Sequence, residues 1–181
     1  QNNVQGAADM GCQPDRLTGY APVEDPEARA RFEEVWGRPL PTARGRTIPE
    51  MYEATLRGEI RGMFLFGEAG VQTDPDSHRP RRALESPELL VVQEIFLSET
   101  AKLAHVVLPG ASALEKDGTF TNGERRIQRV RRALDPPGEA RADWEILCTL
   151  MEATGLPQGF RHPAEVWEEI ASTNVRAQAA A

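Results

Sequence analysis

The chain has 181 residues, 40% of them hydrophobic, and a formal net charge of −7 at pH 7. This length and composition suit one globular domain, or one domain with an appendage. The acidic balance argues against general nucleic-acid binding, which favours a basic surface. No apolar run approaches the roughly 20 residues that a membrane-spanning helix needs. We therefore expect a globular chain that neither spans a membrane nor binds nucleic acid.

The N-terminal third is predicted to contain a loop followed by two helices. Residues 1–24 are rich in Gly, Asn, Gln and Pro, which predicts a long loop. Residues 25–37 begin with Asp-Pro and end at Gly, as an N-capped helix does. A linker with two prolines covers residues 38–46. The next helix, over residues 47–58, begins with the Thr-x-x-Glu spacing of a capping box.

The central part alternates short apolar runs with helical segments. Strands are predicted at residues 60–66, 89–92 and 105–108, with helices at residues 79–84 and 100–104 between them. The second strand is apolar without alternation, as parallel strands covered on both faces are. Strands separated by helices indicate a parallel sheet. Polar residues at the ends of such strands lie where open α/β sheets bind ligands.

The C-terminal part is predicted to form a hairpin and two helices. Residues 119–128 have the pattern of two short strands around Asn122-Gly123, the pair best suited to a type I′ turn. Asp143 is predicted to cap a helix with an apolar stripe, and Pro163 opens the last helix. The hairpin does not continue the parallel pattern, so we expect it to form a small appendage.

Four motifs in a fixed order span nearly the whole chain. They are QNNVQGAADMG at residues 1–11, GE with QT at residues 67–68 and 72–73, QEIFLSETA at residues 93–101, and DWEI at residues 143–146. In order and approximate spacing this set resembles the large catalytic subunit of the molybdopterin-guanine-dinucleotide oxidoreductases, and in particular the formate dehydrogenase alpha subunit. A single glycine pair would be weak evidence, whereas four ordered motifs are strong evidence.

The strand pattern and the resemblance together imply an α/β fold. We expect a Rossmann-like parallel sheet flanked by helices (an α/β/α sandwich), with a small β-hairpin appendage and C-terminal helices. The expected segments are a cofactor-proximal loop (1–24), an α/β molybdopterin-guanine-dinucleotide-binding domain (25–116), the hairpin with a linker (117–140), and C-terminal helices that pack on the α/β domain (141–181). Members of the family are several times longer, so we expect an internal fragment that is not active by itself.

The ends of the first two predicted strands carry most of the candidate cofactor contacts. Gly67 would let a ligand approach the backbone closely, and Thr73 could offer a hydroxyl. From the residues alone, an ordinary turn is the commoner explanation for this pair, and the resemblance reverses that preference. Many formate dehydrogenases have Asp where Ala69 stands, so we expect one polar contact to the nucleotide to be missing or to be supplied elsewhere. The carboxylate of Glu94, or its neighbour Gln93, could accept hydrogen bonds from guanine or ribose.

Ser98, Thr100 and Asp143 lie at predicted helix starts, where free backbone N–H groups favour anions such as pyrophosphate. Each of them could equally be only a helix cap. The resemblance assigns cofactor contacts to the whole set and no catalytic residue or metal ligand to this segment. The predicted cofactor-binding residues are Gln1, Gly67, Glu68, Thr73, Gln93, Glu94, Ser98, Thr100 and Asp143.

The resemblance also implies cofactors and partners for the intact protein. It would oxidise formate to carbon dioxide at molybdenum or tungsten bound by molybdopterin guanine dinucleotide, in the cytoplasm. Its 4Fe-4S cluster would lie outside this segment, because Cys12 and Cys148 cannot supply four thiolates. The partners would be the remaining domains of the alpha subunit, electron-transfer subunits and the small-molecule substrate formate.

Three alternatives stay open at this point. One is the iron–sulfur large subunit of NADH:quinone oxidoreductase, which resembles the same fold without the pterin. Another is a different molybdopterin oxidoreductase, such as a nitrate reductase. The third is a nucleotide-binding or interaction module with no redox role. Independently, the arginine-rich stretch at residues 125–132 suits anion binding or domain docking, with a solvated strand face as the plainer explanation.

Overall fold

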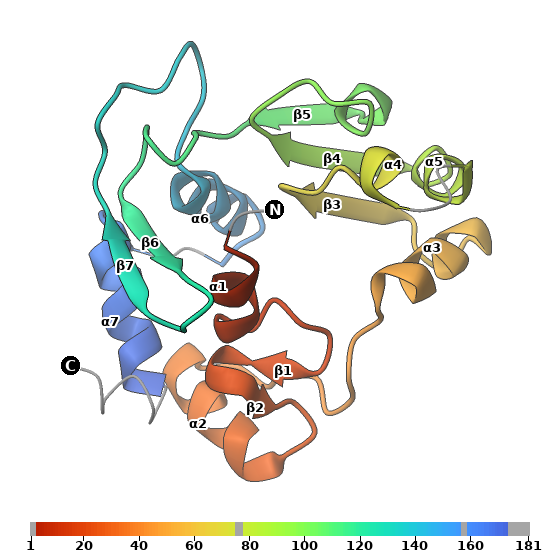
Figure 1. The fold of residues 1–181 in the computed structure, drawn as a ribbon. Coiled ribbons are helices and arrows are strands. Elements are labelled where there is room, and N and C mark those ends of the chain that lie inside the picture. The colour runs from red at the N-terminus through yellow and green to blue at the C-terminus, as the bar shows by residue number, and fades with distance from the viewer. Residues whose placement is uncertain (1–2, 75–77, 157–158, 174–181) are drawn as a thin grey trace. The chain divides into compact units, whose positions relative to one another are not determined.

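The computed structural model describes residues 3–74, 78–156 and 159–173, and these residues group into two compact units (Figure 1). The sheet unit comprises Arg46–Lys116 and Arg132–Gln158. The hairpin unit comprises Gln1–Gly45, Asp117–Arg131 and Gly159–Ala181. This grouping differs from the expected segments, because residues 25–45 belong with the hairpin rather than with the parallel sheet.

The sheet unit is built on three parallel strands in the order β3-β4-β5. The strands are β3 (Gly62–Phe66), β4 (Leu89–Glu94) and β5 (Val106–Pro109). Phe66 is aligned with Gln93 on β4, which in turn is aligned with Leu108 on β5. The predicted parallel sheet is therefore confirmed, and its carboxyl-terminal strand ends are in register with one another.

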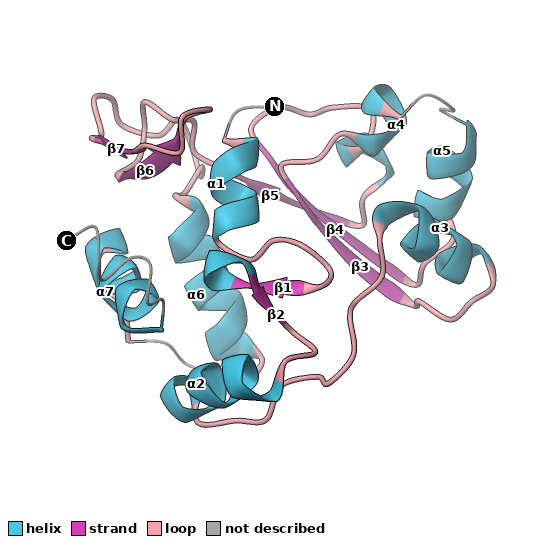
Figure 2. Ribbon diagram, turned by 60° about the horizontal axis from the view of Figure 1, so that its bottom comes forward, coloured by secondary structure: helices cyan, strands magenta, loops and turns pink. Residues whose placement is uncertain are grey.

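Short helical segments before and between the strands cover one face of this sheet (Figure 2). They are α3 (Ile48–Leu56), α4 (Gly70–Thr73), α5 (His78–Leu84) and the 3₁₀ turn η2 (Ala101–Leu103), and α6 (Asp143–Ala153) follows later in the chain. Leu65, Leu90 and Val92 alternate along the strands, as period-2 geometry requires, and pack against Tyr52 and Leu84. This apolar cluster is the core of the unit, and it confirms a parallel sheet flanked by helices.

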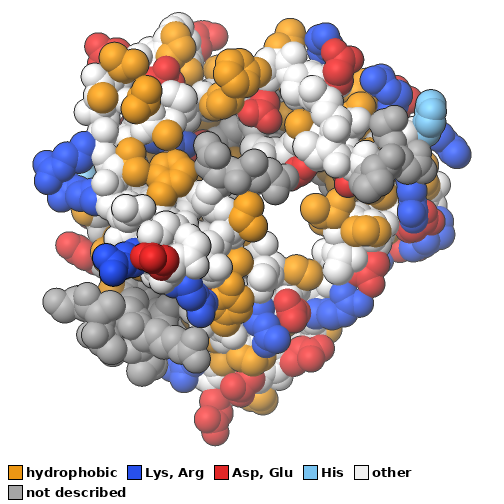
Figure 3. All heavy atoms as spheres, in the orientation of Figure 1, with side chains coloured by type: hydrophobic (Ala, Val, Ile, Leu, Met, Phe, Trp, Pro, Cys, Tyr) orange, Lys and Arg blue, Asp and Glu red, His pale blue; other side chains and the backbone are white. Residues whose placement is uncertain are grey.

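Charged side chains of both signs are interspersed over α3 and α5 (Figure 3). Glu53 on α3 pairs with Arg79 on α5, and Arg57 pairs with Glu59 at 2.7 Å. Each of these side chains is about half exposed. Because solvent screens exposed pairs, they contribute little to stability, and we assign them no functional role.

The described residues of the hairpin unit form three α-helices, one 3₁₀ turn and two small antiparallel sheets. Its elements are α1 (Val4–Asp9), β1 (Arg16–Leu17), η1 (Thr18–Tyr20), β2 (Ala21–Pro22), α2 (Pro26–Trp36), β6 (Gly118–Thr121), β7 (Ile127–Val130) and α7 (Pro163–Thr173). Phe32 is 1% exposed and packs on Trp36, whose Nε1 donates to Glu169 of α7 at 3.1 Å. Asn3 Oδ1 accepts from the Thr121 N–H at 2.8 Å, which joins the start of α1 to β6.

Two expectations for this unit need correction. The long loop predicted for residues 1–24 contains α1, η1 and the β1-β2 pair, because local hydrogen bonds such as Ala7 N–H to Asn3 O organise it. The hairpin itself is confirmed, but its turn is not a two-residue type I′ turn. Residues 122–126 form a longer loop in which Asn122 Oδ1 accepts from the N–H groups of Glu124 and Arg126, and Arg125 has the positive φ.

The arginine-rich stretch takes part in local packing within this unit. Arg125 donates to Asp9 at 2.9 Å, and its guanidinium lies 5.1 Å from the centre of the Tyr20 ring. The hydrogen bond to Asp9 raises the pKa of Arg125 above its ordinary value. The solvated-face interpretation is thus incomplete for Arg125, because this side chain ties the loop to α1.

Candidate functional site

The candidate site lies at the carboxyl edge, the name we give to the ends of β3, β4 and β5 at Gly67, Gln93, Glu94 and Gly110. The Gly67 N–H donates to Gln93 O at 2.9 Å, and the Gly110 N–H donates to Glu94 O at 3.1 Å. The backbone hydrogen bonds of the sheet therefore continue one residue beyond β3 and β5. Three residues predicted from strand ends, Gly67, Gln93 and Glu94, are adjacent at this edge.

Asp143 reaches the carboxyl edge through a short extension of the sheet. Gly110 forms a parallel bridge with Arg141, whose N–H donates to Pro109 O at 3.1 Å. The chain then enters α6, with Ala142 at the N-cap and Asp143 as the first helical residue. The predicted N-cap role of Asp143 is wrong, because Glu145 reaches back to the Ala142 N–H at 3.2 Å and Asp143 is left to bind elsewhere.

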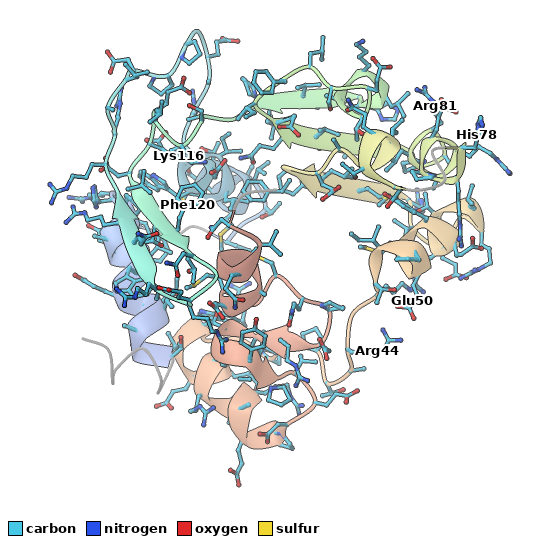
Figure 4. All side chains as sticks on the ribbon, in the orientation of Figure 1. Arg44, Glu50, His78, Arg81, Lys116 and Phe120 are labelled. Atoms are coloured by element: carbon cyan, nitrogen blue, oxygen red, sulfur yellow. The ribbon has the colours of Figure 1, made fainter. Side chains whose placement is uncertain are left out.

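The Asp143 carboxylate joins two side chains from other parts of the unit. Its Oδ1 accepts from Gln93 Nε2 at 2.8 Å. Its Oδ2 accepts from the ammonium group of Lys116. Lys116 follows β5 in the sequence and is labelled in Figure 4. Lys116 and Asp143 have side-chain exposures of 21% and 29%. The carboxyl edge therefore carries a paired charge that is only partly solvated.

Gln93 is the most constrained polar residue of this group. It is 2% exposed, and its Oε1 has no hydrogen-bond partner among the described residues. A buried acceptor without a partner costs about 1–3 kcal/mol. Gly110 lies against Gln93 and Asp143, and a Cβ at Gly110 would lie 3.6 Å from Asp143 Oδ1. A hydrogen-bond donor from a ligand would therefore be favourable at Gln93 Oε1.

The loop after β3 holds three more of the predicted residues. Gly67 has φ +60° and open space around its Cβ position, so its backbone conformation favours glycine. Thr73 donates from Oγ1 to Glu68 Oε1 at 3.0 Å and lies on α4. Glu68 and Thr73 therefore lie together in the structure, although they are five positions apart in sequence.

Ser98 and Thr100 organise the segment after β4. Ser98 Oγ accepts from the Ala101 N–H at 3.1 Å and so caps η2. Thr100 is fully buried, and its Oγ1 accepts from the Val71 N–H at 3.2 Å. This hydrogen bond connects the segment after β4 to α4, so Thr100 holds together two loops of the carboxyl edge.

A second polar pair supports the loop after β3. Tyr52 on α3 is 5% exposed and is hydrogen-bonded to Asp74 at the end of α4. Burial, with the charges of Asp74 and Glu68 adding to it, raises the pKa of Tyr52 to about 12. Gly70 allows this arrangement, because a Cβ there would lie 2.4 Å from the Tyr52 hydroxyl oxygen.

Glu94 and the residues after it are more exposed than Gln93. One carboxylate oxygen of Glu94 accepts from the Ile95 N–H at 2.8 Å. Ile95, Phe96 and Leu97 are 49%, 75% and 66% exposed. These three apolar side chains were not predicted as part of the site, and their exposure is a departure from the usual burial of such residues.

Sequence reasoning also missed Lys116 and Gly110. The Pro-Gly pair that ends the third predicted strand marked the position of Gly110, since it places a glycine at a strand end. Lys116 had no comparable signal, because its partner Asp143 is 27 positions away. Gln1, also predicted as a cofactor contact, lies outside the described residues.

Neither a metal centre nor a membrane-spanning helix is found in the parts of the chain that the structure describes. Within residues 3–74, 78–156 and 159–173, no cluster of three His, Cys, Asp or Glu side chains could hold a metal ion. Over the same ranges, no helix has the length and apolar character to cross a membrane. Cys12 and Cys148 are free thiols, and partial burial raises the pKa of Cys148.

Comparisons with known proteins agree with this architecture. The family profile described as molybdopterin oxidoreductase matches residues 2–153. A Bacillus subtilis (strain 168) protein named "Probable oxidoreductase YjgC" is 45% identical over 170 residues. A Staphylococcus haemolyticus (strain JCSC1435) protein named "Putative formate dehydrogenase SH0748" is 46% identical over the same length. Each match covers 94% of this chain but 17% of the relative, so the chain spans about a sixth of their length.

A solved structure supports the fold. Acetylene hydratase from Pelobacter acetylenicus aligns with a TM-score of 0.60 over 84% of this chain and 22% of that protein. The sequence identity is 19%, so this likeness concerns the fold alone. The family profile matches most of the chain, including the sheet, α6 and the carboxyl edge. The chain therefore belongs to the molybdopterin oxidoreductase family.

Proposed function

We propose that this chain is part of the catalytic alpha subunit of a formate dehydrogenase, and that its carboxyl edge binds part of a molybdopterin guanine dinucleotide. The observation that carries the proposal is the buried Gln93, whose Oε1 is an unpaired acceptor at the end of a parallel strand. Ligands of open α/β sheets bind outside such strand ends. The names of the relatives favour formate as the substrate of the whole protein.

The residues at this edge fit a guanine nucleotide chemically. Guanine and ribose carry N–H and O–H donors, which match the free oxygen of Gln93 and the carboxylate of Glu94. Gly67 leaves open space at the neighbouring strand end, where Glu68 and Thr73 offer a carboxylate and a hydroxyl. In this proposal Asp143 contacts the cofactor or holds Gln93 for it.

The other predicted residues have different parts in the proposal. Ser98 caps η2 next to the carboxyl edge, where its hydroxyl could contact a phosphate or sugar. Thr100 is buried, so it would act on the cofactor through α4 rather than by direct contact. Gln1 is retained as a proposed contact from the resemblance alone.

In the intact protein, molybdenum or tungsten with the pterin would supply the two-electron chemistry that oxidises formate to carbon dioxide and a proton. This chain would bind and orient the nucleotide end of the cofactor. In enzymes that use a cofactor, the protein generally supplies binding and orientation while the cofactor supplies the chemistry. A 4Fe-4S cluster elsewhere in the subunit and separate electron-transfer subunits would carry the electrons away. A cytoplasmic location belongs to the same proposal.

Calorimetric titration of the chain with GDP, with ATP and NAD as comparison ligands, tests the proposal. We expect selective binding of GDP, weakened by Glu94→Ala. Glu88→Ala is the matched control, because Glu88 precedes the opposite end of β4 and pairs with Arg61 at 2.7 Å. Tighter binding of NAD than of GDP, or equal weakening by both substitutions, would contradict a guanine site at the carboxyl edge.

A further inference from the structure

A series of hydrogen bonds links the side chains of Lys116, Asp143 and Gln93 and ends at an unpaired atom, Gln93 Oε1. The Lys116 ammonium donates to Asp143 Oδ2, and Gln93 Nε2 donates to Asp143 Oδ1 at 2.8 Å. The other end of the Gln93 amide, Oε1, is buried and lacks a partner among the described residues. The three residues come from the loop after β5, the start of α6 and the end of β4.

The Lys116 ammonium occupies Asp143 Oδ2, which leaves Asp143 Oδ1 to the Gln93 amide. A carboxylate accepts hydrogen bonds and cannot donate them, and both oxygens of Asp143 accept here, one from the Lys116 ammonium and the other from Gln93 Nε2. The Gln93 amide must therefore turn its NH₂ group toward Asp143. The opposite orientation would place two oxygens in contact and leave two amide donors without acceptors. Gln93 Oε1 is consequently left as a buried acceptor without a partner among the described residues.

We propose that Lys116 is a positioning residue of the carboxyl edge, which through Asp143 fixes Gln93 Oε1 as an acceptor and so selects a ligand group that donates a hydrogen bond. This inference rests on the proposed function, in which the ligand is a guanine nucleotide. Among the N–H and O–H donors of the nucleotide, the proposal assigns this contact to the 2-amino group of guanine or the 2′-hydroxyl of ribose. A ligand that presents only an acceptor at this position would face Gln93 Oε1 and be disfavoured.

Lys116→Met tests the role of the charge, because Met keeps much of the length of the side chain and removes the ammonium. We expect GDP affinity of the 181-residue chain to fall about tenfold in calorimetry, which corresponds to the loss of one well-placed hydrogen bond. Lys116→Arg should restore affinity to within about twofold, since it keeps the cation. Lys102→Met is the matched control, because Lys102 pairs with the exposed Glu99 and not with Asp143 or Gln93.

Two nucleotide analogues identify the donor. IDP lacks the 2-amino group of guanine, and 2′-deoxy-GDP lacks the ribose hydroxyl. In the wild-type chain one of them should bind about tenfold more weakly than GDP, and this difference should shrink toward onefold in Lys116→Met. If the affinities of IDP and 2′-deoxy-GDP relative to GDP are both the same in Lys116→Met as in the wild type, the selection of a donor group is overturned.

A direct contact between Lys116 and phosphate is the competing explanation for weaker GDP binding. Guanosine separates the two, because it has the base and ribose without the diphosphate. A positioning role predicts that Lys116→Met weakens guanosine and GDP by the same factor. Weakening of GDP alone would overturn the positioning role and assign Lys116 to the diphosphate.

A measurement without ligand tests the same arrangement independently of the proposed function. The side-chain amide protons of Gln93, assigned in nuclear magnetic resonance spectra by their loss in Gln93→Met, should exchange slowly in the wild type and in Lys116→Arg. They should exchange faster in Lys116→Met, and exchange that is equal in all three would overturn the inference. Absence of GDP binding to a wild-type chain with slow exchange would count against the proposed function and the selection of a donor, while supporting the orientation of the amide.

Discussion

The hydroxyl oxygen of Thr100 accepts a hydrogen bond from the backbone N–H of Val71 at 3.2 Å, across 29 positions of sequence. Both residues are almost fully buried. The bond joins the segment after β4 to α4, which follows β3, so two loops of the carboxyl edge depend on one side chain. Thr100 thus contributes to the site as part of its support.

Thr100→Val should destabilise the chain by about 1–3 kcal/mol, because it leaves the Val71 N–H buried without an acceptor while preserving side-chain shape. Thr100→Ser keeps the acceptor and should retain most of the stability. Unfolding in urea measures the difference in free energy. Thr149→Val is the control, since the Thr149 hydroxyl lies on the exposed side of α6. A Thr100→Val chain as stable as the control would show that this hydrogen bond contributes little.

Alkaline pH should weaken the sheet unit through Tyr52. The folded state raises the pKa of Tyr52 from 10.0 to about 12 through burial and Asp74, so the folded chain keeps a proton that the unfolded chain releases. Stability is therefore fully present below pH 10 and is lost as pH rises from 10 to 12, by about 1 kcal/mol at pH 11. Urea midpoints between pH 9 and 11.5 measure this slope, which Tyr52→Phe should flatten. An unchanged slope in Tyr52→Phe would contradict the assignment to Tyr52.

Gly70→Ala should destabilise the loop after β3, because the added methyl group would lie 2.4 Å from the Tyr52 hydroxyl oxygen. Overpacking of a buried position typically costs about 1–3 kcal/mol. Tyr52→Phe removes the oxygen atom, so the double variant should lose less stability than the sum of the two single variants. Thermal or urea unfolding of the four proteins measures this coupling, and simple additivity would count against a direct clash.

Asn3→Ala should loosen the hairpin unit, where Asn3 Oδ1 accepts from the Thr121 N–H at 2.8 Å. Thr121 is 7% exposed, so its N–H would lose its acceptor in a poorly solvated place, at a cost of about 1–3 kcal/mol. Hydrogen exchange of the Thr121 amide is the direct readout and should accelerate about tenfold or more. Asn3→Asp keeps an acceptor oxygen and should preserve protection. Equal exchange in Asn3→Ala and the wild type would rule out this bond as the cause of protection.

The parallel sheet could be predicted from sequence because its information is local. The apolar runs in β3, β4 and β5 are separated by helical segments, and this order specifies parallel pairing. Parallel strands bring their carboxyl ends to one edge, so Gly67, Gln93 and Glu94 could be expected to lie together. The prediction failed where several local signals compete, as at Asn122, whose side chain organises a longer loop than the Asn-Gly pair suggested.

The roles of individual polar residues could not be predicted in the same way. Asp143 has the sequence context of a helix cap, yet Glu145 reaches back to the N-cap and Asp143 binds Gln93 and Lys116. Thr100 has the context of a helix start, yet it is buried under α4. A capping motif describes the next three residues of the chain, whereas these contacts join residues 27 to 50 positions apart.

The sequence by itself determined the order of strands and helices, the parallel sheet and the residues at its strand ends, because hydrophobic periodicity and turn residues act over a few positions. Only the tertiary structure decided that Gln93 is buried with its side-chain oxygen unpaired, and that Asp143 accepts hydrogen bonds from both the Gln93 amide and the Lys116 ammonium. The physical reason is that the direction of a hydrogen bond depends on which donors and acceptors the folded chain brings together.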